Sequence, residues 1–199
     1  MKKYLKQTID KIQEEISKDK GEIRLYSSKL AYYKGEPYSS GYFIYPRKKD
    51  SHVVIALGLD RKDYDSAVIL IHEYCHYMQW KTQTEIWKKY EVLYNKYLDN
   101  EIEENDEELI KATVNMEAEC EEMTSKALKD FSISEKKDRV KQVNAYLVFY
   151  QIFLETSKWY KNPPFENKDI LDLMPEESIK EPLKYKIDKN LYELYKECL

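Results

Sequence analysis

Glycine and proline are scarce in this chain, which has 4 glycines and 6 prolines among 199 residues. Together they make up roughly 5% of the sequence, against about 12% in an average protein. So few turn-forming residues predict a mostly helical protein. The contents of 42% hydrophobic and 14% aromatic residues exclude wholesale disorder, although 35% of the residues are charged. The length predicts one domain that can bury a core without help from a disulfide or a metal.

Three further features are missing. The sequence has no basic excess, with 33 basic against 37 acidic residues, and this excludes the simplest kind of nucleic-acid binding. Its most apolar run, Ala145–Leu154, has about half the length that a membrane span needs, and the start of the chain lacks the apolar segment of a signal peptide. The 3 cysteines show no CxxC spacing, so we expect reduced thiols. We therefore expect a cytoplasmic protein that binds neither nucleic acid nor a membrane.

The N-terminal part of the chain changes from a helical to a β pattern. Apolar residues spaced by three and four, from Leu5 to Ile16, predict an amphipathic helix that ends at Gly21. Short β-rich runs follow, divided by turn residues and by a charged turn at Arg47–Asp50. They predict a small antiparallel sheet, whose most buried strand is Val53–Leu57.

The rest of the chain has the spacing of helices. A helix capped by Asp65 or Ser66 can continue to Leu98, and a second covers Glu107–Asp130. Another follows Ser132 or Ser134 and reaches Tyr160, and a last one begins near Asp188. We therefore expect an α+β fold with a small antiparallel sheet on a mainly helical body. The predicted single domain, 1–199, consists of an N-terminal helix (1–21), the sheet (22–59), a helical body (65–160) and a helical tail (161–199).

Two of the three histidines lie in one pentapeptide, His72-Glu73-Tyr74-Cys75-His76. On a helix, positions i and i+4 share a face, so both imidazoles can bind one ion. Glu73 is turned about 100° away from His72 and stands beside such an ion, where a carboxylate can take a proton from water. The pattern is the zinc-protease helix motif, and the apolar run before it indicates a buried site.

A catalytic zinc ion needs a third protein ligand, and no histidine is well placed to supply it. His52 fits the edge of the Val53 strand, and the cysteines lack a partner spacing. Carboxylates are the better source, and the segment Glu117–Glu122 contains four of them. Helical spacing leaves open which one turns inward, because Glu119 and the pair Glu117 and Glu121 each lie on a stripe with apolar residues.

These residues resemble the gluzincin type of zinc metallopeptidase, in which two histidines on one helix and a glutamate on the next bind zinc. In that group an acidic residue four positions after the ligand glutamate hydrogen-bonds a ligand histidine. The resemblance implies that Glu117 is the third ligand and that Glu121 is this partner, although the group more often has aspartate there; Glu119 is the alternative ligand.

The chain is also similar to small HExxH proteins of bacteriophages and prophages. The matching stretches are Ile71–Trp80, Glu117–Glu121 and Asn144–Tyr150. The resemblance is specific in these short stretches and loose over the last two-thirds of the chain. A more distant resemblance is to the ImmA/IrrE-type regulatory metallopeptidases, through the same helix pair. The resemblance implies a minimal zincin-like fold.

From these features we expect a zinc-dependent hydrolase, in particular a metallopeptidase acting on a peptide or protein. Glu73 would accept the proton of the attacking water and pass it to the leaving amine. Tyr146 or Tyr150 could stabilise the oxyanion, and the Val53–Leu57 strand could offer an edge to an extended substrate. The alternative is a non-catalytic, zinc-containing module that binds a protein, such as a phage accessory or regulatory protein.

Overall fold

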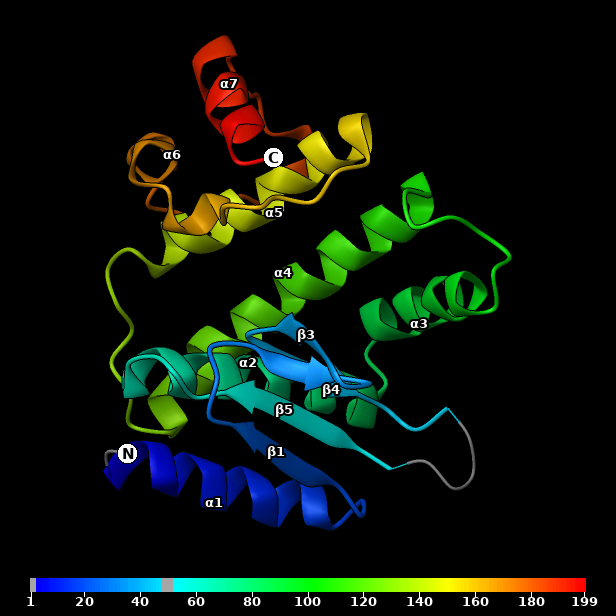
Figure 1. Cartoon of the computed structure of the whole chain (residues 1–199), viewed down its shortest axis with the longest axis vertical. Coiled ribbons are helices and arrows are strands. Elements are labelled where there is room, and N and C mark those ends of the chain that lie inside the picture. Colours follow the sequence, from blue (N-terminus) through cyan, green and yellow to red (C-terminus); the bar gives the residue numbers. More distant parts are fainter. Residues whose placement is uncertain (1–2, 48–51) are drawn as a thin grey trace. The chain divides into compact units, whose positions relative to one another are not determined.

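The computed structural model describes residues 3–47 and 52–199 and confirms the α+β fold class (Figure 1). Most of the predicted charged turn at Arg47–Asp50 lies outside the described residues. The elements, in chain order, are α1 (Lys3–Ser17), β1 (Glu22–Tyr26), β2 (Ala31–Tyr33), β3 (Glu36–Ser39), β4 (Gly41–Ile44), β5 (Val54–Gly58), α2 (Asp63–Thr82), α3 (Glu85–Leu98), α4 (Glu107–Asp130), α5 (Arg139–Thr156), η1 (Pro164–Glu166), α6 (Lys168–Leu173), η2 (Pro182–Lys184) and α7 (Lys189–Glu197).

The chain divides into two compact units. The first contains residues up to 84 and residues 120–134, and the second contains residues 85–119 and 135–199. The long helix α4 therefore contributes its first half to the second unit and its second half to the first. The prediction of a single domain over 1–199 stays a prediction.

The three-stranded sheet of the first unit is mixed, where an antiparallel sheet was predicted. Its order is β1-β5-β4, with β1 parallel and β4 antiparallel to β5. Strand β5 therefore has a parallel neighbour on one edge and an antiparallel neighbour on the other. The short strands β2 and β3 form a separate antiparallel pair. The suggested use of the Val53–Leu57 strand as an edge for an extended substrate is wrong, because β5 is paired on both edges; β1 and β4 are the outer strands of this sheet.

Strand β5 is buried on both faces and organises the core of the first unit. Val53, Ile55 and Leu57 pack with apolar residues of α1, α2 and the end of α4. On the opposite face Ala56 packs with Ala31 of β2 and Tyr42 of β4. The sheet therefore holds α2 on one face, with the β2–β3 pair on the other (Figure 1).

Helix boundaries agree with the sequence at several points. Helix α4 spans the predicted residues, and Asp188 caps α7 by accepting a hydrogen bond from the Leu191 backbone N–H at 2.8 Å. Helix α2 begins slightly earlier than predicted and ends at Thr82. Gln83 adopts a left-handed conformation (φ 52°), so the helix expected to continue to Leu98 is interrupted before α3.

Helix α5 forms the centre of the second unit and is shorter at both ends than predicted. Its buried Asn144 donates to the carbonyls of Pro175 and Glu177 and accepts from the Ile179 backbone N–H. Two turns later, Gln151 donates to the carbonyls of Pro182 and Tyr185. These two amides fix the irregular tail that precedes α7.

Within residues 3–47 and 52–199, no helix combines the length and the hydropathy that crossing a membrane requires.

Candidate metal centre

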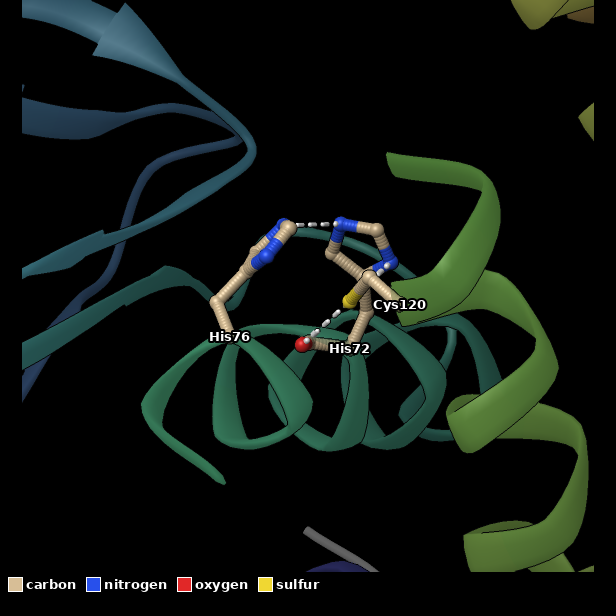
Figure 2. Close-up of side chains that lie close together, drawn as sticks. All are labelled: His72, His76 and Cys120. Atoms are coloured by element: carbon tan, nitrogen blue, oxygen red, sulfur yellow. Dashed lines mark hydrogen bonds between the residues drawn. The ribbon is translucent and has the colours of Figure 1, made fainter. Parts of the chain in front are cut away.

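The motif histidines lie on α2 as their spacing predicts, one turn apart. Their Nε2 atoms face each other at 3.0 Å, and the two rings are nearly perpendicular (Figure 2). His76 is buried, whereas His72 is half-buried. The apolar residues around the two histidines, among them Leu70 and Ile71, bury this helix against the sheet.

Each histidine has an oxygen close to its other ring nitrogen. The Nδ1 atom of His72 lies 3.2 Å from Oε1 of Glu121 on α4. The Nδ1 atom of His76 lies 2.9 Å from Oε1 of Gln79, one turn further along α2. A neutral imidazole has one N–H and one lone pair, so an acceptor at Nδ1 favours a proton there and a lone pair at Nε2.

The two lone pairs would then point at each other, which is unfavourable unless a cation shares them. Two nitrogen ligands of one tetrahedral zinc ion are about 3.3 Å apart, close to the separation of the Nε2 atoms. Oxygen partners at the outer nitrogens are also usual for histidines that bind metals. The arrangement of these two imidazoles therefore fits a divalent metal ion.

Cys120 on α4 is a third possible ligand, which was not predicted from the sequence. One ligand atom each from His72, His76 and Cys120 lies within 4.8 Å of the others. The Cys120 thiol is fully buried; it donates to the His72 carbonyl at 3.3 Å, and its Sγ lies 3.6 Å from His72 Nδ1 (Figure 2). The signal for Cys120 in the sequence is its position next to Glu121, within the segment Glu117–Glu122 that was predicted to supply the third ligand.

Cys75 has a different environment, although it lies inside the motif. Its thiol packs in the core of the first unit, and burial there raises its pKa to about 12. Cys75 does not belong to the group of possible ligand atoms that gathers at His72, His76 and Cys120 in the described part of the chain.

Glu73 is buried on α2, with 7% of its surface exposed, beneath the start of β4. A methyl carbon placed on Gly41 of β4 would lie 3.1 Å from Oε1 of Glu73 and 2.6 Å from Cγ2 of Ile69. Glycine at position 41 therefore lets the strand approach this carboxylate closely. This contact could not be predicted from the sequence, since it depends on how β4 crosses α2.

The other predicted site residues belong to the second unit. Glu117 and Glu119 are half-buried in the part of α4 that belongs to the second unit, and their role as ligands stays a prediction. In that unit the hydroxyls of Tyr146 and Tyr150 are 3.0 Å apart, and burial, with the nearby charge of Glu117, raises the pKa of Tyr146 well above its usual value. Their role as oxyanion donors also stays a prediction.

His52 agrees with its predicted position just before β5. It is exposed, and its Nε2 lies 3.1 Å from Oε1 of Glu22 on β1.

Comparison with known proteins gives no match to this chain among protein-family models, curated proteins or solved structures.

Proposed function

We propose that this protein is a zinc-dependent hydrolase, in particular a peptidase. The observation that carries the proposal is the convergence of the His72 and His76 Nε2 atoms at 3.0 Å, with an oxygen acceptor at each outer nitrogen. A buried Glu73 next to the first histidine completes the arrangement. A purely structural zinc site has no need of such a carboxylate.

The residues have separate tasks in this proposal. His72 and His76 hold the metal, which supplies Lewis-acid chemistry that polarises a carbonyl and makes water reactive near neutral pH. Glu73 takes the proton of the attacking water and returns it to the leaving amine. Glu121 orients His72 through its Nδ1–H.

The third ligand comes from α4. The resemblance to gluzincins supports Glu117, and the geometry adds Cys120. Cobalt(II) can distinguish them, because a thiolate ligand gives a sulfur-to-metal charge-transfer band in the near ultraviolet and a carboxylate does not. A band that Cys120→Ser removes would assign Cys120, whereas loss of metal in Glu117→Gln with no such band would assign Glu117.

The resemblance to gluzincins and to small phage HExxH proteins supports a peptide or protein substrate. We place the protein in the cytoplasm, the host cytoplasm if a phage encodes it, where its three free thiols stay reduced.

Metal analysis and a protease assay test the proposal. Purified protein should contain one zinc ion per chain and lose it in His76→Ala. A set of fluorogenic peptides of varied sequence should be cleaved by wild-type protein and not after chelation. Native protein that binds no zinc would overturn the proposal.

The contact of Cys120 with His72 supports a second candidate, a non-catalytic module that binds a protein. If Cys120 and a glutamate of α4 both join the histidines, the zinc ion has four protein ligands and no open position, as in structural sites. Such a protein would bind zinc tightly and cleave none of the peptides.

A further inference from the structure

Gln79 differs from the other polar residues near the histidines in that it is neutral, completely buried and part of the same helix. Its exposed fraction is 0%, and its Oε1 lies 2.9 Å from His76 Nδ1. His76 and Gln79 are three positions apart on α2, so helix geometry alone brings their side chains together.

The two histidines are therefore held by unlike partners. His72 has a carboxylate, Glu121, which reaches it from another helix at 3.2 Å. His76 has an amide from its own helix. A neutral amide oxygen accepts the Nδ1–H without adding a negative charge, so it fixes where the ring proton lies and raises ring basicity less than a carboxylate would.

We infer that Gln79 is a positioning residue that holds His76 in its Nδ1–H form, so that the Nε2 lone pair points to the position shared with His72. This inference rests on the proposed function, because that lone pair matters only if a metal binds there. Without the acceptor the His76 proton can move to Nε2, where it would occupy the position of the metal and would have to be displaced before binding.

Two substitutions separate this task from packing. Gln79→Met retains the length of the side chain and removes the acceptor, whereas Gln79→Glu retains an acceptor. Gln151→Met is the matched control. Gln151 lies on α5, and its side-chain amide donates to the backbone carbonyls of Pro182 and Tyr185.

The first measurement is zinc affinity, obtained by competition with a chromogenic chelator. We expect Gln79→Met to bind zinc about 10–100-fold more weakly, as is typical when the partner of a ligand histidine is lost. Gln79→Glu should bind about as tightly as wild type, and Gln151→Met should lower thermal stability without changing zinc affinity. Equal zinc affinity in Gln79→Met and wild type would overturn the inference and leave the proposed function intact.

The second measurement needs no metal. Long-range ¹H–¹⁵N correlation spectra distinguish the two tautomers of histidine, and 3 histidines give few signals to assign. At a pH where the rings are neutral, metal-free wild type should show His76 with its proton on Nδ1, and Gln79→Met should show a mixture. A His76 proton on Nε2 in wild type would overturn the inference, whereas wild type that has the expected tautomer but binds no zinc would overturn the proposed function alone.

Discussion

Helices α2 and α5 are the most deeply buried long helices of their units, and both carry buried polar side chains. On α5, Asn144 binds backbone groups, with three partners in the segment 175–179. On α2, polar side chains meet one another, with His72 against His76 and His76 against Gln79. A buried polar group that binds the backbone stabilises a particular chain path. The two imidazoles of α2 instead meet at their Nε2 atoms, 3.0 Å apart, and this convergence supports the proposed metal site.

The largest expected effect tests whether Glu73 on α2 acts as the general base. Glu73→Gln should lower peptide hydrolysis by about 10²–10⁴-fold, because an amide cannot act as the general base. Zinc content and the free energy of unfolding should hardly change. Assays of the turnover rate, with metal analysis alongside, check this, and Glu14→Gln on the exposed face of α1 is the matched control. Full activity in Glu73→Gln would remove Glu73 as the base.

A substitution on α5 should instead lower stability and leave zinc affinity unchanged. Asn144→Ala removes one acceptor and two donors from buried hydrogen bonds and should lower the free energy of unfolding by about 3 kcal/mol. Urea unfolding measures this change, with the exposed Asn162→Ala as the control. Zinc affinity should stay at the wild-type value. A loss of zinc affinity as large as that in His76→Ala would show that the two helices do not differ as described.

Gly41→Ala tests the close approach of β4 to α2. The added methyl would lie 2.6 Å from Ile69 Cγ2 and 3.1 Å from Glu73 Oε1, so neighbouring atoms must move. Overpacking of this kind should cost about 1–2 kcal/mol of stability and should lower turnover by displacing the carboxylate. Thermal unfolding and peptide cleavage measure both. Unchanged turnover in Gly41→Ala would contradict a role of this glycine in positioning Glu73.

The smallest effect concerns a polar cluster on α2 that is structural. Tyr77 donates to Asp19, and Lys81 lies 2.9 Å from the same carboxylate, so the pKa of Asp19 is lowered, chiefly by the hydrogen bond from Tyr77. A lowered pKa stabilises the fold above the unfolded-state value near 4, and that contribution disappears as the pH falls through the folded-state value.

Asp19→Asn should therefore be less stable than wild type by about 1 kcal/mol at pH 7, since the carboxylate is partly exposed. The difference should shrink as the pH falls through the lowered folded-state pKa of Asp19 and vanish once that carboxyl is protonated. Denaturant titrations at several pH values check this. A difference that persists at low pH would show that packing, and not charge, accounts for it.

Local spacing allowed most helices and the centre of the site to be predicted. His72 and His76 are neighbours because any helix brings i and i+4 together, and Asp188 caps α7 through its own backbone neighbours. The interruption at Gln83 was not predicted, because neither glycine nor proline marks it. The parallel pairing of β1 with β5 joins strands about 30 residues apart, and strand alternation contains no information about that order.

The proposed third ligand illustrates the same limit. Whether Glu117, Glu119 or Cys120 faces the histidines depends on the rotation of α4 about its axis. Both candidate stripes of that helix contain apolar residues, so periodicity gave no decision. The structure orients Cys120 and Glu121 toward His72, contacts that span 48 and 49 positions.

The three cysteines are free and buried, with Cys75 and Cys120 in the first unit and Cys198 in the second. A thiol reagent can reach them only when the surrounding structure opens, so the rate of labelling at each cysteine measures a local opening equilibrium. The native chain therefore contains reporters of both units without any added probe. Zinc should slow the labelling of Cys75, which lies in the core of the first unit, more than that of Cys198, and this difference would measure how far metal binding stabilises one unit alone.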